Sequence, residues 1–191
     1  RMSRGLGDVY KRQIMDGSYE KIKSWIIDGR ADCGFLVDTR IADMQFIPLC
    51  QDTLYAVFPN GHPFSQFKNI NTMLLKDEIF IVPSEGTLRD IHYLIGEFYA
   101  PSNRFLNTIS DTSALALVQN GLGFSILPGI LLQGSLSDLI ECRKIDGCKF
   151  HTLGVATQKG RYISPAVKCF LNFIKTWCSE HEEILHFTLP H

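Results

Sequence analysis

Apolar residues recur along this chain at two spacings, one typical of helices and one typical of buried strands. Between residues 18 and 27 an apolar stripe returns every three or four positions, and Gly29 ends the predicted helix. The apolar run 31–37 that follows has the length of a buried strand. Helix, glycine turn and strand therefore predict one α/β unit near the start of the chain.

The same order of elements is clearest between residues 111 and 128. Four apolar residues from 114 to 118 mark one helix face, and Asp111 or Thr112 stands where the N-cap is expected. Glycines at 121 and 123 follow the last periodic residue, where a glycine closes a helix without a Cβ penalty. The apolar run 124–127 then predicts a short buried strand that Pro128 ends.

Other segments extend this pattern over the rest of the chain. Pro48 and a polar pair at 51 and 52 interrupt the long apolar stretch 44–58, so it predicts two strands in series. Helices are further expected over 71–75, 86–99, 128–132 and 164–180, and strands over 79–82, 105–109, 138–145 and 153–157. Strands that alternate with helices imply an α/β fold, with a parallel-rich sheet and helices on its faces.

Two long strand passages, near residues 48–52 and 143–150, bracket the middle of the chain. The chain is therefore expected to leave one α/β lobe, build a second and return to the first. We assign residues 14–51 and 146–191 to lobe I and residues 52–145 to lobe II. Two lobes joined by crossing strands make a hinged cleft, and ligands of such sheets bind beside the carboxyl ends of strands.

The charge balance bears on the partners of the chain. Its 19 Lys and Arg residues face 20 Asp and Glu residues, so there is no basic excess to hold phosphates, and DNA is not expected as a direct partner. No apolar run reaches the ~20 residues needed to cross a bilayer, and no secretory leader opens the chain. The sequence thus predicts a cytoplasmic protein without a membrane partner.

The first candidate binding site is the turn of Ser84, Glu85, Gly86 and Thr87, between a predicted strand and its helix. Two hydroxyls, free backbone amides and the helix dipole favour a carboxylate, and the glycine lets the backbone approach a ligand. The same residues also suit a plain capping turn, since serine or threonine satisfies the first amides of a helix without a ligand.

Two further candidate sites come from the starts and ends of predicted strands. Asp38, Thr39 and Arg40 follow the strand 31–37, and Arg40 can pair with an anionic effector through two hydrogen bonds; alternatively this is a solvated loop. Gly123, Phe124 and Ser125 lie where the glycine turn meets its strand. The ring of Phe124 either stacks on a ligand or belongs to the core.

The sequence offers little support for a catalytic site, a metal site or a cofactor site. The chain lacks G-x-S-x-G, P-loop and H-E-x-x-H patterns, and its G-L-G at 121–123 closes a helix where a dinucleotide fingerprint opens one. Six cysteines and six histidines are dispersed without metal-ligand spacing. The cysteines suit buried thiols in a reducing compartment, although Cys142 and Cys148 flank a turn and can form a redox pair. His62 is expected to be structural.

Four short motifs, in this order, resemble the effector-binding domain of LysR-type transcriptional regulators. A helix that ends in G-x-x-D is matched by residues 29–32, and a strand that ends in P-x-x-H-P by residues 59–63. The pattern V-x-x-G-x-G-x-x-x-x-P is matched by residues 118–128, and S-P-A at the start of the last helix by residues 164–166. The resemblance covers about residues 14–178.

The resemblance implies a type 2 periplasmic-binding-protein-like fold with two Rossmann-like lobes. It implies a sensor without enzymatic activity, in which a small effector binds between the lobes and shifts the DNA-bound conformations of the parent protein. In this family the turn at 84–87 normally helps to line the effector site. The intact bacterial protein would form homodimers or tetramers and bind DNA through an N-terminal domain.

The first thirteen residues are rich in cationic groups and show little apolar period, so we expect a non-native or disordered segment. The alternative is a genuine polar arm. Without them, the resemblance implies that the chain lacks the DNA-binding domain and the opening strand–helix–strand of the effector domain.

Two other classes of protein share the two-lobed fold. The chief alternative is an extracytoplasmic solute receptor of a transporter, against which the absent leader and the six unpaired cysteines argue. The third class is an enzyme such as a dehydratase or deaminase, against which the missing acid–base constellation argues.

Overall fold

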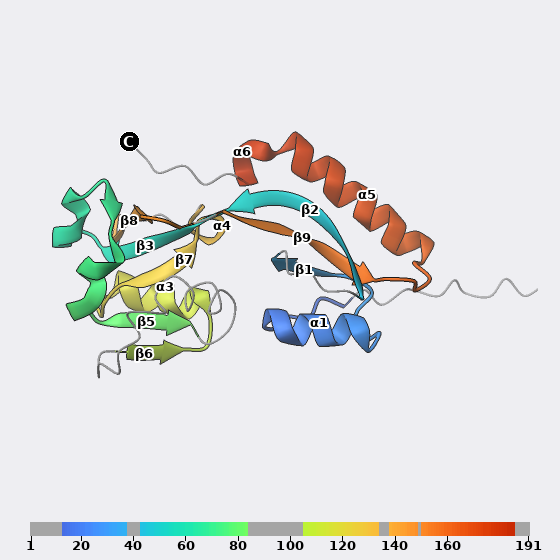
Figure 1. Ribbon diagram of the computed structural model, residues 1–191, viewed down its shortest axis with the longest axis horizontal. Coiled ribbons are helices and arrows are strands. Elements are labelled where there is room, and N and C mark those ends of the chain that lie inside the picture. The colour runs from blue at the N-terminus through green and yellow to red at the C-terminus, as the bar shows by residue number, and fades with distance from the viewer. Residues whose placement is uncertain (1–12, 38–42, 84–104, 134–137, 149, 186–191) are drawn as a thin grey trace, which may run out of the picture.

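The computed structural model describes residues 13–37, 43–83, 105–133, 138–148 and 150–185. Its elements form two groups that long strands connect (Figure 1). One group holds a three-stranded sheet with a helix on each side, and the other holds the remaining strands with helix α3 (Asp111–Gln119). This is the two-lobed α/β fold that the resemblance implied.

The first sheet has the strand order β1-β9-β2. Its central strand β9 (His151–Gln158) pairs antiparallel with both β1 (Gly34–Val37) and β2 (Met44–Asp52). The expectation of a parallel-rich sheet is therefore wrong for this part of the chain. The physical reason is that β9 returns from the second group and enters between two strands that run toward it.

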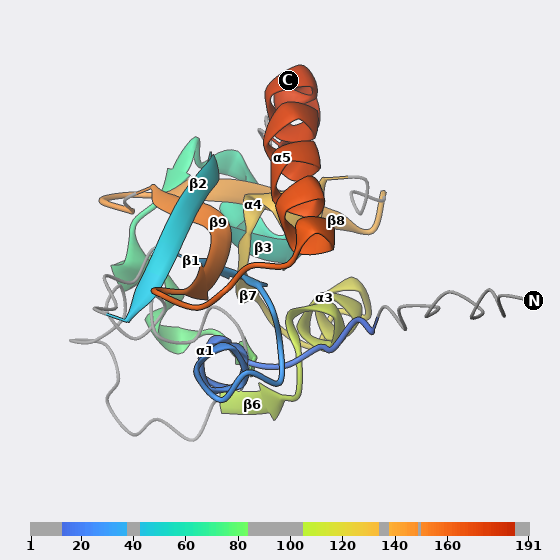
Figure 2. The same ribbon diagram turned by 90° about the vertical axis from the view of Figure 1, so that its right-hand side faces the viewer.

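A helix covers each face of this sheet. Successive side chains of a strand point to opposite faces, so neighbouring residues of β1 contact different helices. Leu36 packs with Ile26 of α1 (Tyr19–Ile27), whereas Phe35 contacts Phe170 of α5 (Pro165–Glu180). Figure 2 shows these two helices on opposite sides of the strands. The short helix α6 (Glu182–Leu185), which the sequence did not predict, packs with α5 against β2.

The second group is organised around β3 (Leu54–Pro59), whose residues 54–58 are all buried. β3 pairs antiparallel with β7 (Ser125–Pro128) and with β8 (Ile140–Ile145), whereas β5 (Phe80–Pro83) pairs in parallel with β6 (Phe105–Thr108). A parallel bridge between Phe80 and Phe124 places β5 beside β7. The parallel pairing expected from the sequence thus exists here, interrupted by β3.

Short elements complete the second group. β4 (Asn69–Ile70) pairs in parallel with β8, and two 3-10 helices, η1 (Pro63–Gln66) and η2 (Thr72–Asp77), flank it. The helical turn α4 (Gly129–Leu132) follows β7 directly. Apolar side chains fill both faces of the sheet: Phe58, Phe80 and Phe124 form part of one cluster, and Val57, Ile81 and Leu127 join α3 in the other.

Serine N-caps start three helices. Ser18, Ser110 and Ser164 have extended backbones, and each hydroxyl accepts a hydrogen bond from a backbone N–H in the first turn of α1, α3 or α5. The expected N-cap of α3, Asp111 or Thr112, is therefore wrong. Ser110 has the extended conformation that an N-cap requires, and its Oγ accepts from the Ser113 N–H at 3.3 Å.

The boundaries of other elements differ modestly from the prediction. β1 begins at Gly34 rather than at residue 31. The stretch 44–58 forms two strands, as predicted, which divide at Thr53. Pro48 does not end β2, because a register shift between Pro48 and Cys50 accommodates the proline within the strand. The helix predicted over 86–99 lies outside the described residues.

Asp52 fixes the joint between β2 and β3. Its carboxylate is buried, and its two oxygens accept from the N–H groups of Thr53 at 2.8 Å and Ile130 at 3.1 Å. The carbonyl of Thr53 accepts from the Gly129 N–H at 2.9 Å, so the joint is tied to α4. On the second crossing, Cys148 reaches the same place, where the Thr53 hydroxyl donates to its Sγ at 3.4 Å.

His62 has a structural role, as the sequence predicted. Its Nδ1 accepts from the Phe64 N–H at 3.3 Å, and its ring stacks on Phe58 with centroids 5.0 Å apart. Its Nε2 lies 3.7 Å from a carboxylate oxygen of Glu78, a partner that sequence spacing did not reveal. The histidine therefore fastens η1 and the end of η2 to the core.

These contacts predict unequal protection of backbone amides. The Ile81 N–H donates to the Phe124 carbonyl and the Phe124 N–H to the Ile79 carbonyl, both inside the buried core, so these amides should exchange slowly. Amides of β1, which among the described residues pairs with β9 alone, should exchange faster. Hydrogen exchange followed by mass spectrometry tests this, and equal protection of β1 and β7 would contradict it.

Candidate functional site

The directions of the strands determine where the predicted binding segments leave the two groups of elements. β1 and β2 run in the same direction, because both are antiparallel to β9. In Figure 1, β2 points toward the second group, while β5 and β6 point toward the first. The carboxyl ends of β1 and of β5 and β6 are therefore directed toward one another from the two groups. Ligands of α/β sheets bind beside such ends.

Two of the predicted site segments follow these strand ends. β1 ends at Val37, directly before Asp38, Thr39 and Arg40, and β5 ends at Pro83, directly before the turn 84–87. Both segments themselves lie outside the described residues, so their contact with an effector stays a prediction.

The third predicted segment lies at the other end of β5. Phe124 bridges to Phe80, the first residue of β5, so it sits about 10 Å, three strand residues, from Pro83. Its ring is buried and stacks on Phe80 with centroids 4.8 Å apart and 10° between the planes. The core alternative for this side chain is thus what the structure shows, because the parallel register aligns the two rings.

Ser125 and Gly123 also have structural roles. The buried Ser125 hydroxyl donates to the Ile81 carbonyl at 2.8 Å, which satisfies it without a ligand. Gly123 has a φ of 154°, and a Cβ there would collide with the Ile79 carbonyl. Only glycine allows β7 to approach β5 this closely. Contact of these residues with an effector remains a prediction that the burial does not favour.

Sequence reasoning missed a group of hydroxyls that does lie at the carboxyl end. Thr108, the last residue of β6, is paired with Pro83, the last residue of β5. The Thr108 hydroxyl donates to the Ser110 carbonyl at 3.1 Å, and the Ser110 Oγ lies 2.9 Å from the Thr112 Oγ1 and 3.1 Å from the Ser113 Oγ. The signal was a run of small polar residues between a strand and its helix.

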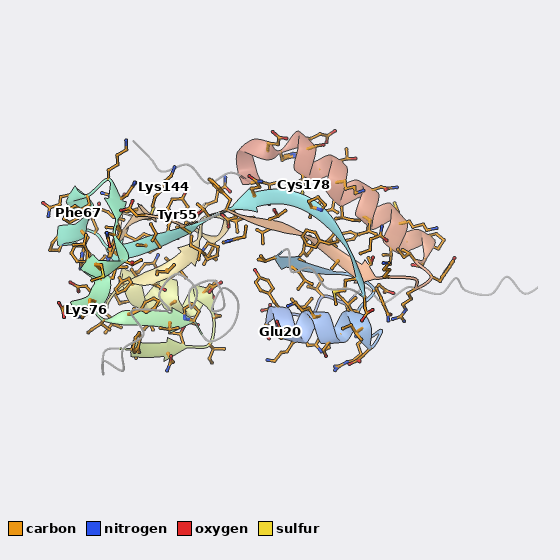
Figure 3. All side chains as sticks on the ribbon, viewed as in Figure 1. Glu20, Tyr55, Phe67, Lys76, Lys144 and Cys178 are labelled. Atoms are coloured by element: carbon orange, nitrogen blue, oxygen red, sulfur yellow. The ribbon has the colours of Figure 1, made fainter. Side chains whose placement is uncertain are left out.

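The hydroxyls after the end of β6 can offer hydrogen bonds to a ligand. The hydroxyls stand at the amino end of α3, where the helix dipole is positive, and Asp111 in the first turn already places an anion there. Charged residues are spread over both groups, for example Glu20 on α1 and Lys76 and Lys144 in the second group (Figure 3). Such an end suits a small polar ligand.

Two of the thiols, those of Cys50 and Cys142, are poor nucleophiles. All six cysteines are free. Burial raises the pKa of Cys50 and of Cys142 to about 11, so both thiols are protonated at neutral pH. Within the described residues, no three His, Cys, Asp or Glu side chains come together as a metal site requires.

The architecture defines the class, a two-lobed domain of the periplasmic-binding-protein type, and sequence comparison gives the family. The family model of the LysR substrate binding domain matches residues 12–179. The chain therefore belongs to the LysR substrate-binding-domain family, the sensing part of transcriptional regulators. This confirms the resemblance in the motifs and favours a regulator over a transporter's receptor.

Among curated proteins, the uncharacterized HTH-type transcriptional regulator YybE of Bacillus subtilis (strain 168) is similar to this chain. The two are 27% identical over 147 residues, which make up 72% of this chain and 47% of the relative. The chain thus spans about half the length of the curated relative that it matches.

Solved structures share the fold. The effector binding domain of QuiR in complex with shikimate has a TM-score of 0.70 at 24% identity, with 86% of this chain and 80% of that chain covered. The Synechocystis PCC6803 CcmR regulatory domain in complex with 2-PG has a TM-score of 0.73 at 19% identity, with 86% and 81% covered. The reduced OxyR regulatory domain from Pseudomonas aeruginosa has a TM-score of 0.67 at 20% identity, with 83% and 79% covered.

No helix in the described part of the chain combines the length and the apolar character that crossing a membrane requires.

The two glycines after α3 should differ in their tolerance of alanine. Gly121 has a φ of 75° with nothing within 4 Å of an added Cβ, so Gly121→Ala should destabilise the fold by about 1–2 kcal/mol. Gly123→Ala adds the collision with the Ile79 carbonyl and should cost about 2 kcal/mol more. Urea unfolding measures both, and equal losses would contradict the close approach of β7 to β5.

Proposed function

We propose that this chain senses a small anionic effector, most simply a carboxylate, between its two lobes. Lobe I comprises residues 14–51 and 146–191, and lobe II comprises residues 52–145. The effector is held by the loop of Asp38, Thr39 and Arg40 on one side and the turn 84–87 on the other. The observation that carries this proposal is the direction of β1 and β5, whose carboxyl ends point toward one another.

The cluster of hydroxyl-bearing residues after the end of β6 extends this proposal. Ser110, Thr112 and Ser113 offer hydroxyls, and Asp111 beside them disfavours a second anion. We therefore assign the effector's carboxylate to Arg40 and the turn 84–87. Its hydroxyl or amino groups are assigned to the hydroxyls at the amino end of α3. The complex of the QuiR domain with shikimate, a hydroxylated carboxylic acid, supports a ligand of this class.

The effector acts by population shift. Binding changes how the lobes are oriented about the joint at Asp52 and Thr53, and with it the DNA-bound conformation of the parent regulator. The parent protein is a cytoplasmic homodimer or tetramer, and its DNA contacts come from a separate helix-turn-helix domain. The chain has no catalytic role in this scheme and uses no cofactor.

A ligand screen tests the anionic site. Calorimetry against hydroxylated carboxylic acids, amino acids and neutral sugars should give binding for one or more of the carboxylates and none for the sugars. Thr87→Ala should weaken the bound acid by ~1 kcal/mol, about fivefold in Kd, because one hydrogen bond is lost. Thr176→Ala, at an exposed position on α5, is the matched control and should leave Kd unchanged. Binding of sugars alone would overturn the anionic site.

The balanced charge predicts that this chain does not bind duplex DNA by itself. With 19 cationic and 20 acidic side chains, it gains little from counterion release. Fluorescence anisotropy with labelled promoter DNA at physiological salt should show no change at micromolar protein. A sequence-specific complex would contradict the assignment of DNA binding to another domain.

A further inference from the structure

The chain crosses between the two groups of elements twice, and the two crossings differ in length. The first crossing has one residue, Thr53, between the end of β2 at Asp52 and the start of β3 at Leu54. The second crossing spans residues 146–150, between β8 and β9. Because a hinge rotation falls on residues outside the paired strands, Thr53 is the point about which the first crossing can turn.

Every polar group of Thr53 has a hydrogen-bond partner. Its N–H donates to the Asp52 carboxylate at 2.8 Å, and its carbonyl accepts from the Gly129 N–H at 2.9 Å. Its hydroxyl donates to the Sγ of Cys148, on the second crossing, at 3.4 Å. A rotation about Thr53 would break or bend these bonds, so partners on both sides of the joint hold the first crossing in one conformation.

The second oxygen of Asp52 reaches across to the second group. Asp52 is 4% exposed and pairs with His151 in the first sheet, yet its carboxylate accepts from the Ile130 N–H of α4 at 3.1 Å. The N-cap residue of α4 is Pro128, whose ring has no acceptor for the first amides of the helix. The end of a strand in the first sheet therefore caps a helix of the second group.

We propose that the Asp52 carboxylate is the restraint that fixes the orientation of the two lobes. It holds the end of β2 against α4, so turning the lobes about Thr53 requires the bond to Ile130 to break. Hydrogen bonds to a charged group are stronger than those between neutral groups, and burial keeps water from replacing them. The effector then acts against this restraint, a consequence that rests on the proposed function.

The variant Asp52→Asn tests the restraint without an effector. The amide has one acceptor oxygen, so it keeps the shorter bond to Thr53 and loses the bond to Ile130, whose amide should exchange about tenfold faster or more. Spin labels on ketone-bearing residues at the exposed positions of Lys76 and Thr176, one in each lobe, leave the six free cysteines unlabelled. Pulsed electron-spin resonance on the full chain should show a broader distribution of inter-label distances in Asp52→Asn.

Two further variants separate orientation from stability. Val57→Ala removes buried volume from the core of the second group, away from the joint, so it should lower the urea midpoint and leave the distance distribution narrow. Pro128→Ser gives α4 an N-cap of its own, because residue 128 already has the extended backbone that an N-cap requires. Combined with Asp52→Asn, it should restore stability and keep the distribution broad.

The double variant also decides the case in which Asp52→Asn alone does not fold. A broad distribution in the double variant supports the restraint. A narrow distribution there, or an unchanged one in folded Asp52→Asn, would overturn the proposal, because Asp52 would then only stabilise α4. Since no ligand is present in these measurements, their outcome is independent of whether the chain binds a carboxylate effector.

Discussion

A buried carboxylate lies at the joint between the two halves of this domain. Asp52 stands where the chain passes from the first sheet to the second, and a buried carboxylate is tolerated only when hydrogen-bond donors surround it. Its oxygens accept from the N–H of Thr53, which lies between β2 and β3, and from the N–H of Ile130 in α4. The returning chain passes the same point, since Asp52 lies opposite His151 in the register of β2 and β9. Both crossings therefore share one short joint.

The joint also determines how the candidate site is assembled. Because β9 returns antiparallel between β1 and β2, the carboxyl end of β1 must point toward the second group. Within that group the parallel pair β5 and β6 ends facing the first group, and Thr108 and Ser110 stand at that end. A ligand between the groups would thus contact residues on both sides of the joint. Small rotations about Asp52 would change the spacing of those residues.

Aromatic packing decides what the strand β7 contributes. The Phe124 ring contacts Phe80, with centroids 4.8 Å apart, and Phe58, with centroids 6.0 Å apart, and His62 stacks on Phe58. This stack fixes the register of β5 against β7, and Gly123 permits it by removing the Cβ that would strike Ile79. The motif V-x-x-G-x-G-x-x-x-x-P is accordingly explained by backbone approach and core packing.

The sequence by itself determined the local elements and the family. Helical spacing, with glycine after α1 and α3, marked α1, α3 and α5 to within a residue or two, because periodicity and the end of a helix depend on near neighbours in the chain. The short motifs identified the two-lobed class, and the polar turns after the strands at 37 and 83 gave a candidate site.

Only the tertiary structure decided strand direction, pairing and burial. The insertion of β9 between β1 and β2, the placement of Phe124 in the core and the position of Thr108 beside Pro83 all join residues far apart in sequence. A period of two or 3.6 tells which face of an element is apolar, but it does not tell which element covers that face. That choice depends on the joint at Asp52 and on the register of the sheets, which arise only when the whole chain packs.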